Sequence, residues 1–347
     1  MVMNVGHEID LKKYEIRTDL VLDTIENNSS DIDKHVNSYG SIKVTKVNVD
    51  SESSILLNKK EGNYVTIEFK DVTDTENRNK LEDIFVKEFR EILKDIGIKD
   101  DDVCLVVGLG NKDSTPDSLG PKVIKNILVT SHLFALKEDV SKGIRSVSAI
   151  SPGVMANTGI ETVDIITSII KMFNPSFVIA IDALAASSID RINKSIQITD
   201  TGIHPGSGVG NQRKEISFST IGVPVIAIGV PTVVESSIIV YDTIEYLFKH
   251  ISYIKDNANK NKFIFNRHNY LEKIKDRNLS LGDKKKVSGL LGELSEQDRH
   301  ALIYEVLNSL DYNFIVTPKE IDFLIDKLSN VLSCGINKAL HNGEVSN

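Results

Sequence analysis

Two aspartates follow apolar runs in the way that carboxylates at the edge of an open α/β sheet do. Asp117 stands in the loop of "CLVVGLGNKDSTPDSLGPKV" (Cys104–Val123), and Asp182 ends the apolar run of "FVIAIDALAASS" (Phe177–Ser188). Parallel strands end at one edge of such a sheet, and that edge is where these proteins build their sites. We therefore expect the two carboxylates to lie in one crevice.

A pair of neighbouring carboxylates can hydrolyse a peptide bond. One stays ionised and activates water, while the other has its pKa raised by the like charge and protonates the leaving group. Each residue also has a simpler interpretation. Asp117 would cap a helix that begins near Ser118, and Asp182 would cap a turn at the end of its strand.

The Gly108-X-Gly110 turn resembles that of a dinucleotide-binding domain, but the match stops there. Such a turn needs a third glycine three residues after the second, so that helix and strand can pack closely, and Asp113 holds that position. The P-loop, HExxH and GxSxG motifs are also missing, and neither cysteine has a plausible base nearby in the sequence. Nucleotide hydrolysis and Ser or Cys nucleophilic catalysis are therefore disfavoured.

A third segment, "GIHPGSGVGNQRKEIS" (Gly202–Ser217), has the composition of a ligand-binding loop. Its backbone N–H groups would bind a carbonyl or carboxylate, with Arg213 close behind; the glycines concerned are Gly206, Gly208 and Gly210. A glycine-rich surface hairpin that enters a strand at Ile216 explains the same pattern. Both interpretations stay open.

His204 is the one histidine near these three features. It would serve as a third metal ligand beside Asp117 and Asp182, or as an ordinary loop residue next to a proline. The residues alone leave the choice open, and we expect no metal and no other cofactor.

The apolar periodicity predicts an α/β protein with a three-layer, doubly wound, mostly parallel sheet. Short apolar runs alternate with helical stretches from Val103 onward, as parallel strands buried on both faces do. Before them, residues 41–49 and 63–70 alternate like an antiparallel strand pair, and a helix follows over residues 75–96.

Helices are expected to follow the core, which spans roughly residues 100–250. A lysine-rich region, roughly 251–315, reads as an appended helical region, and a last helix is expected over 318–341. In "TPKE", Thr317 is placed to cap that helix, with Pro318 at its first position and Glu320 completing a capping box.

Composition excludes several classes of partner. The 347 residues carry a net charge of −8, from 41 Lys+Arg and 49 Asp+Glu, so phosphate backbones are not attracted and no direct nucleic acid partner is expected. The 2 cysteines have no pairing framework, and neither a signal peptide nor a membrane span is apparent. These observations predict a soluble cytoplasmic protein without a membrane partner.

Five segments in order resemble one family, the germination protease of spore-forming bacteria. They are "IRTDL" (16–20), "GLGN…TPDSLGP" (108–121), "IDALA" (181–185), "GIHPGSGVGN" (202–211) and "VTPKEID" (316–322). The resemblance implies an endopeptidase of the forespore and spore core that degrades small acid-soluble spore proteins during germination. It also implies an inactive precursor, a homotetramer, and essential acids at Asp117 and Asp182.

The core is also similar to that of hydrogenase maturation endopeptidases, which use acidic residues at the same two strand ends around a metal. Their histidine ligand has no clear counterpart except His204. A metal-dependent maturation endopeptidase is therefore the second candidate, and a catalytically silent peptide-binding protein of the same fold is the third.

The segment "EIRTDLVLDTIE" (residues 15–26) predicts self-processing between Asp19 and Leu20. Substrates of the family that the chain resembles are cut after an acidic residue and before a large apolar one. Residues 1–19 would then form a propeptide and residues 20–347 the protease domain. The alternative is that Ile16 and Leu20, four residues apart, anchor an ordinary helix start.

Overall fold

The computed structural model describes residues 18–27, 32–136, 140–206, 213–257, 274, 277–310 and 312–341. The chain divides into two compact units. The larger comprises Arg17–Val233 and Thr317–Asn347, and the smaller comprises Met1–Ile16 and Val234–Val316.

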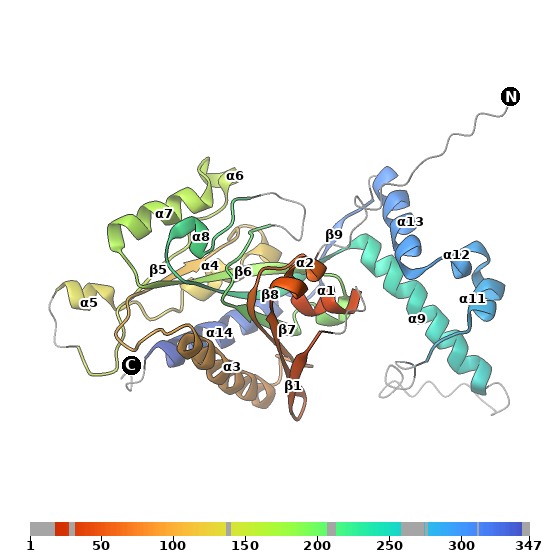
Figure 1. Cartoon of the computed structure of the whole chain (residues 1–347), viewed down its shortest axis with the longest axis horizontal. Coiled ribbons are helices and arrows are strands. Elements are labelled where there is room, and N and C mark those ends of the chain that lie inside the picture. The colour runs from red at the N-terminus through yellow and green to blue at the C-terminus, as the bar shows by residue number, and fades with distance from the viewer. Residues whose placement is uncertain are drawn as a thin grey trace. The chain divides into compact units, whose positions relative to one another are not determined.

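A single mixed sheet forms the centre of the larger unit (Figure 1), with the strand order β1-β2-β3-β7-β8-β6-β4-β5. β4 pairs in parallel with β5 and β6, whereas β1, β2, β3, β7 and β8 pair antiparallel in succession. The strands are β1 (Lys34–Tyr39), β2 (Ile42–Val49), β3 (Gly62–Glu68), β4 (Cys104–Gly108), β5 (Val147–Ile150), β6 (Phe177–Ala186), β7 (Ser195–Thr199) and β8 (Val225–Glu235).

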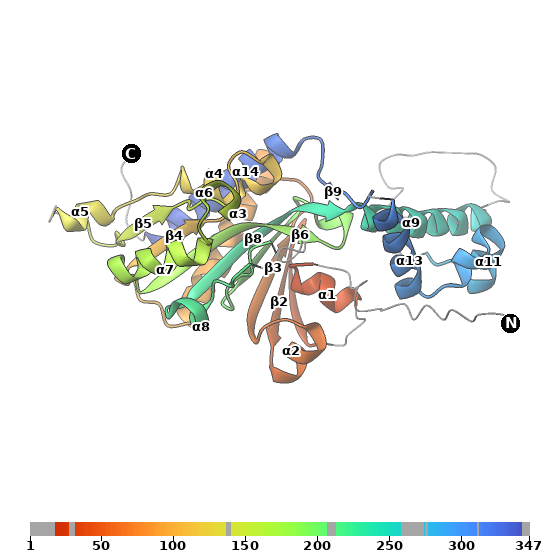
Figure 2. The same ribbon diagram turned by 90° about the horizontal axis from the view of Figure 1, so that it is seen from above.

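Helices cover both faces of the parallel part, which confirms the α/β class and the three layers. Figure 2 shows α3 (Thr75–Asp95) and α14 (Ile321–Leu340) on one side of the sheet, and α7 (Thr162–Phe173) and α8 (Phe218–Ile221) on the other. An apolar core lies on each face of the sheet, and alternate residues of β4 contribute to each. Val106 packs in the core with α3 and α14, and Leu105 packs in the core with α7. This two-sided burial is why the strand reads as a continuous apolar run.

The predicted antiparallel pair is present as β2 and β3, and it belongs to the same sheet. β3 pairs with β7, so the pair extends the parallel part instead of standing apart from it. α1 (Val21–Asn27) and α2 (Ser51–Leu57) pack in a small apolar cluster with β2 and β3. The short elements of this unit are α4 (Leu119–Ile124), α5 (Ser131–Ala135), α6 (Met155–Thr158), and the 3-10 turns η2 (Thr115–Asp117) and η3 (Ile189–Arg191).

The last helix differs from its prediction at its start. α14 begins at Ile321, and neither a capping box nor any other side-chain cap forms. The hydroxyl of Thr317 donates to the carbonyl oxygen of Thr232 at 2.8 Å instead. The expected capping box is therefore wrong, because the helix begins at Ile321 with Glu320 at the N-cap position, and Thr317 lies three residues before that position.

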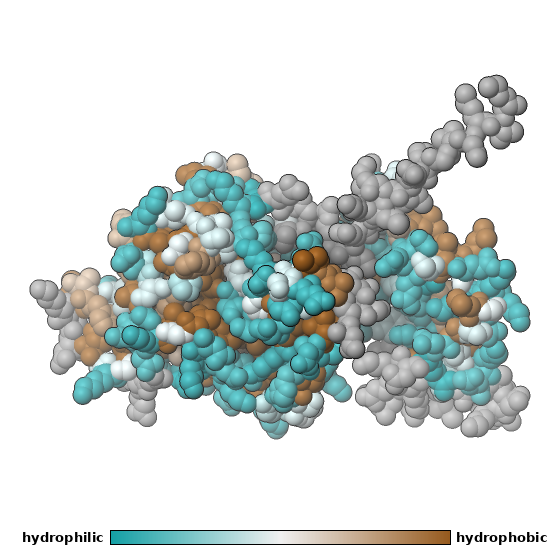
Figure 3. Space-filling view, in the orientation of Figure 1, coloured by the Kyte–Doolittle hydropathy of each residue, from teal (hydrophilic) through white to brown (hydrophobic). Residues whose placement is uncertain are grey.

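The smaller unit is helical, and the predicted appended region, roughly 251–315, falls within it. It contains α9 (Ser236–Asn257), α11 (Leu281–Ser288), α12 (Leu290–Glu293), α13 (Glu296–Ser309) and β9 (Ile315–Val316), which pairs with the end of β8. Apolar side chains are exposed on α11–α13 (Figure 3), among them Leu281, Leu290 and Val306. Among the described residues, no helix has the length and apolar character needed to cross a membrane.

Candidate functional site

Asp117 lies in the loop that leaves β4, at the end of the turn η2. The backbone N–H of Asn111 donates to its carboxylate oxygen Oδ2 at 2.9 Å and to its carbonyl oxygen at 3.0 Å, which closes the loop. α4 starts after Ser118, and no side chain caps it. The interpretation of Asp117 as a helix cap is therefore wrong, because its carboxylate binds back into its own loop.

Glycines allow the helix and the loop to approach the end of β4. A Cβ on Gly120 would lie 2.2 Å from the carbonyl oxygen of Leu109, and one on Gly108 would lie 2.4 Å from that of Gly120. Gly110 has φ +103°, and its Cβ would meet the carbonyl oxygen of Asp117 at 2.1 Å. Gly120 thus provides the close helix–strand packing that a dinucleotide-binding turn obtains from a third glycine, and the loop before it is free to carry Asp117.

Asp182 lies within β6, since this strand continues to Ala186. The expectation that the strand ends at Asp182 is wrong. β4, however, pairs with β6 only as far as Ile181, so Asp182 is the first residue beyond the end of its neighbour. The side chain is 4% exposed, and its Oδ1 accepts a hydrogen bond from the N–H of Ala183 at 2.9 Å.

Burial and charge give the two carboxyl groups different affinities for protons. Burial raises the pKa of Asp117 to about 6, although the hydrogen bond from the Asn111 N–H lowers it in part. Burial, and then the charges of Asp117 and Asp19, raise the pKa of Asp182 well above its usual range. Asp117 therefore ionises first and Asp182 keeps its proton against that charge. Near neutral pH the arrangement offers one base and one acid.

The residues around the predicted cleavage bond lie against β6, next to this pair. The N–H of Asp19 donates to the carbonyl oxygen of Ala185 at 3.1 Å, and the N–H of Ala185 donates to Oδ2 of Asp19 at 2.9 Å. Gln197 on β7 donates from Nε2 to the carbonyl oxygen of Asp19 at 3.2 Å and accepts at Oε1 from the N–H of Val21 at 2.8 Å. Lys59 donates to the carbonyl oxygen of Thr18 at 2.8 Å.

Gln197 and Lys59 are not among the site residues predicted from the sequence. Gln197 had a signal, because it is a polar residue inside the otherwise apolar strand Ser195–Thr199. Lys59 had none, since it stands in a polar stretch between α2 and β3.

The chain that follows the predicted bond is packed into the protein. α1 begins at Val21, and the side chains of Leu20 and Val21 are fully buried. Asp23 pairs with the buried Arg191 and accepts from the N–H of Ser187 at 2.6 Å. A helix start does lie here, as the alternative interpretation expected, while Ile16 lies outside the described residues.

The glycine-rich segment begins and ends as a hairpin. Ile203 and Ile216 form an antiparallel bridge, and Gly206 adopts φ +74°. Arg213 donates to the sulfur of Met155 at 3.0 Å and lies 3.7 Å from a carboxylate oxygen of Glu161. Gly208 and Gly210 lie outside the described residues.

His204 is engaged away from the two aspartates. Its Nε2 lies 2.8 Å from a carboxylate oxygen of Glu215, which also pairs with Lys60. Within the part of the chain that the structure describes, no group of three or more His, Cys, Asp or Glu side chains is placed to hold a metal ion. The three-ligand site that the sequence allowed is therefore not formed by His204 with Asp117 and Asp182.

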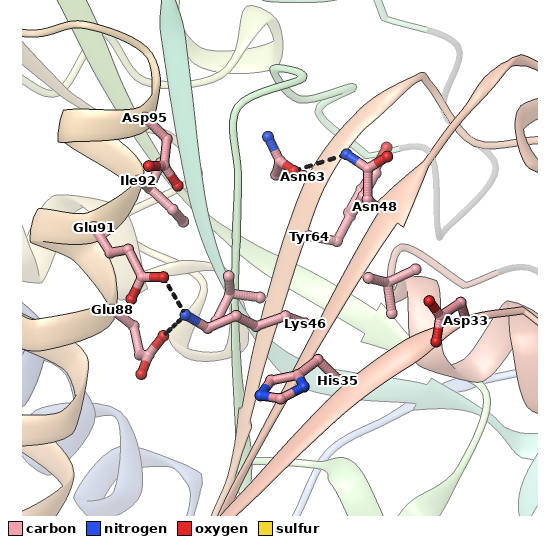
Figure 4. Close-up of a pocket in the computed structure, with 12 residues that line it drawn as sticks. Asp33, His35, Lys46, Asn48, Asn63, Tyr64, Glu88, Glu91, Ile92 and Asp95 are labelled. Atoms are coloured by element: carbon pink, nitrogen blue, oxygen red, sulfur yellow. Dashed lines mark hydrogen bonds and ion pairs between the residues drawn. The ribbon is translucent and has the colours of Figure 1, made fainter.

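A separate pocket of about 220 Å³ lies between α3 and the strands β2 and β3 (Figure 4). Lys46 reaches carboxylate oxygens of both Glu88 and Glu91 at 2.7 Å across its wall. Neither Asp117 nor Asp182 lines it. This pocket is thus separate from the surroundings of the two aspartates.

Comparison with known proteins gives one consistent result along the chain. The family model described as germination protease matches residues 10–347. Germination proteases of Bacillus cereus strain G9842 and of Priestia megaterium are 47% and 44% identical to it, each over 96% of this chain and over 95% and 96% of their own lengths. That of Bacillus velezensis is 46% identical over 97% of this chain.

A solved structure also shows a partial likeness. The NiFe hydrogenase maturation protease of Thermococcus kodakarensis is 19% identical, with a TM-score of 0.27 over 42% of this chain and 80% of that one.

Proposed function

This chain belongs to the germination protease family, and from that premise we propose that it is an endopeptidase of the spore core, made as an inactive precursor. Its substrates are small acid-soluble spore proteins, which it begins to degrade when a spore germinates. The observation that carries the proposal is the placement of two carboxyl groups, Asp117 in the loop that leaves β4 and the buried Asp182 just beyond the end of the β4–β6 pairing. Burial raises the pKa of both groups. No metal takes part.

The two carboxyl groups divide the hydrolysis between them. Ionised Asp117 accepts a proton from water as the water oxygen bonds to the peptide carbonyl carbon. Asp182 then gives its proton to the leaving nitrogen as the C–N bond breaks. The new amine and carboxylate leave, and a proton passes from Asp117 back to Asp182 through solvent. Each group thus returns to its starting state.

Substitution of either aspartate tests this mechanism. Asp117→Asn and Asp182→Asn are expected to lower the cleavage of an unfolded small acid-soluble spore protein by about a thousandfold, with unchanged circular dichroism. Asp113→Asn, an exposed aspartate of the same loop, is the matched control and should leave the rate unchanged. Near-normal turnover by a folded Asp117 or Asp182 variant would refute the assignment.

Chelation separates the proposal from the other candidates. With a carboxylate pair, exhaustive chelation leaves the rate unchanged, and His204→Ala retains the chemical step. Activity that is lost on chelation and restored by one divalent ion would instead indicate a metal-dependent maturation endopeptidase. Binding of the spore protein without any cleavage would indicate a silent peptide-binding protein.

Self-processing at the Asp19–Leu20 bond accounts for the inactive precursor. It is supported by the position of this bond against β6. Asp19 forms hydrogen bonds with Ala185 on this strand, and the charge of Asp19 contributes to the raised pKa of Asp182. The precursor segment then competes with substrate for one groove. N-terminal sequencing of the activated protein should begin at Leu20, and Asp117→Asn and Leu20→Asp should each prevent processing. Any other start, or full activity of the unprocessed chain, contradicts the proposal.

The glycine-rich loop, with His204, Gly206, Gly208, Gly210 and Arg213, shapes the substrate groove in this proposal. Support comes from Arg213, which bridges from the loop to Met155 and Glu161. Arg213→Met should raise KM several-fold and leave kcat within about twofold, since it alters binding and not the acids. A fall in kcat alone would argue against this role.

Assembly as a homotetramer completes the proposal. It is supported by the exposed apolar side chains of α11 and α12, where Leu281 is 73% and Leu290 80% exposed. Such side chains become buried when they take part in a protein interface. Light scattering of the Leu281→Glu/Leu290→Glu variant should give a smaller assembly than the unaltered chain, whereas an unchanged tetramer places the interface elsewhere.

A further inference from the structure

We propose that Lys59 and Gln197 form a subsite that accepts an acidic residue of a protein substrate together with the peptide bond that follows it. In the precursor, Asp19 fills this subsite. The inference rests on the proposed function and assigns its substrate preference to particular side chains. It follows from three features of the contacts around residues 18–21.

The first feature is a positive charge that binds the residue before Asp19. Lys59 is half-buried, with its ammonium group 2.8 Å from the carbonyl oxygen of Thr18. Burial lowers its pKa, and the charges of Asp19 and Asp23 oppose that effect. A desolvated ammonium group is stabilised by a carboxylate far more than an exposed one is.

Only one of these two carboxylates leaves on processing. Asp23 lies beyond the bond, on α1, and is held by Arg191 and by the N–H of Ser187. Asp19 lies before the bond, so it departs with residues 1–19. Lys59 then loses a carboxylate that an acidic substrate residue can replace.

The second feature is the N–H of Ala185, which donates to Oδ2 of Asp19 at 2.9 Å. A backbone N–H donates most strongly to a carboxylate, and it also donates to the amide oxygen of an asparagine. The N–H therefore fixes the position of the side chain, while Lys59 selects for its charge.

The third feature is the way in which Gln197 spans the bond. Its amide donates to the carbonyl oxygen of Asp19 and accepts from the N–H of Val21. Both of these are backbone groups, so Gln197 holds the chain whatever its side chains are. Gln197 is 6% exposed. Processing removes the carbonyl oxygen of Asp19 while Val21 stays on α1, so the buried Nε2 alone loses its partner, which is costly. That cost favours entry of a substrate backbone after residues 1–19 have left.

A double-mutant cycle on the full-length precursor tests the pairing. Self-processing rates are measured for the unaltered chain, Asp19→Asn, Lys59→Met and the double variant. Asp19→Asn keeps an acceptor for the Ala185 N–H and removes only the charge. Each single variant should slow processing by about tenfold or more, and the double variant should be no slower than the slower single one. Effects that multiply, or a Lys59→Met rate equal to that of the unaltered chain, overturn the proposal.

Peptide substrates give a second test. If Lys59 had only a structural role, its substitution would not change the preference for an aspartate peptide over an asparagine peptide. Each protein, once processed, is assayed on a peptide of residues 15–26 and on the same peptide with asparagine for aspartate at position 19. The unaltered enzyme should prefer the aspartate peptide in kcat/KM by about tenfold or more, and Lys59→Met should abolish that preference. Gln197→Met should weaken both peptides equally and keep the preference. An unchanged preference in Lys59→Met refutes the assignment.

Two controls separate failure of the subsite from failure of the proposed function. Lys80→Met removes an exposed lysine on α3 that pairs with Glu76, and it should change neither readout. Asp182→Asn should abolish processing in every background. If the unaltered chain is not processed, or the Asp182→Asn chain is, the proposed function fails. If processing depends on Asp182 but the two variants act independently, only the subsite fails.

Discussion

At Asp117 and Asp182, burial raises both pKa values, but the order of ionisation makes the two residues chemically different. The carboxylate of Asp117 lies in a loop and accepts one hydrogen bond from a backbone N–H, whereas Asp182 lies on a strand and its side chain is buried. Whichever carboxyl group ionises first makes the second ionisation harder. The different burial of the two groups therefore decides which one is the base.

The pH dependence of kcat/KM follows from this order. Because Asp117 acts as the ionised base and burial raises its pKa to about 6, kcat/KM should rise as pH increases through about 6. It should fall again at higher pH as Asp182 loses its proton, which gives a bell-shaped profile. Initial rates on the peptide of residues 15–26 at constant ionic strength measure it. A lower limb near pH 4 would exclude Asp117 as the base, and Asp113→Asn should leave the limb in place.

The burial of Asp182 should lower the free energy of unfolding of the protein at high pH. A carboxyl group whose folded-state pKa is raised stabilises the fold below its unfolded pKa of about 3.9, and that stability is lost as pH rises through the folded pKa. Asp182→Asn removes this loss and keeps the oxygen that accepts from Ala183. The variant should therefore be more stable than the unaltered chain at pH 8, with little difference at pH 4. Urea unfolding at both pH values measures this; a less stable variant at pH 8 contradicts it.

Among the elements, the turn between β4 and α4 is the most constrained part of the site. Gly110 has φ +103° and touches Asp117, whereas Gly159 has φ +71° with open space around it. Gly159→Ala should cost only about 1 kcal/mol in stability, with cleavage unchanged. Gly110→Ala must move Asp117, so cleavage should fall by about a hundredfold. Parallel cleavage and thermal unfolding assays test this, and equal activity of the two variants would contradict it.

The local sequence pattern predicts which segments form helices and strands better than it predicts which other residues those segments contact. The apolar runs at β4 and β6 identify buried strands, and the family motifs indicate Asp117 and Asp182. The sequence predicts that β6 ends at Asp182, and this is wrong. The strand continues to Ala186, beyond the point where its neighbour β4 ends. Whether Gln197 meets Asp19 depends on contacts between residues 178 positions apart in the chain. No local periodicity encodes such contacts.

The larger unit as a whole depends on its last helix. α14 packs on α3, α4 and the turn η2. Ile325, Leu328 and Leu332 are completely buried there. Each such side chain contributes about 1.5–3 kcal/mol, so the helix as a whole supplies much of a typical stability of about 5–15 kcal/mol.

Deletion from Thr317 onward should therefore abolish cooperative unfolding as well as cleavage. Phe323→Ala, on the same helix but 50% exposed, is the matched control and should change the stability by less than about 1 kcal/mol. Circular dichroism during thermal unfolding distinguishes the two cases. A truncated chain that still unfolds cooperatively would show that the sheet is stable without α14.

The position of α14 also sets when the acids can work during synthesis. Among the described elements it is the last to be synthesised, yet it supports η2, which carries Asp117. A nascent chain can form β2 and β3 early, since N-terminal segments emerge first. The loop of Asp117 therefore gains its full support only once α14 has emerged and packed. Until then, a nascent chain lacks the contacts that hold one of its two acids in place.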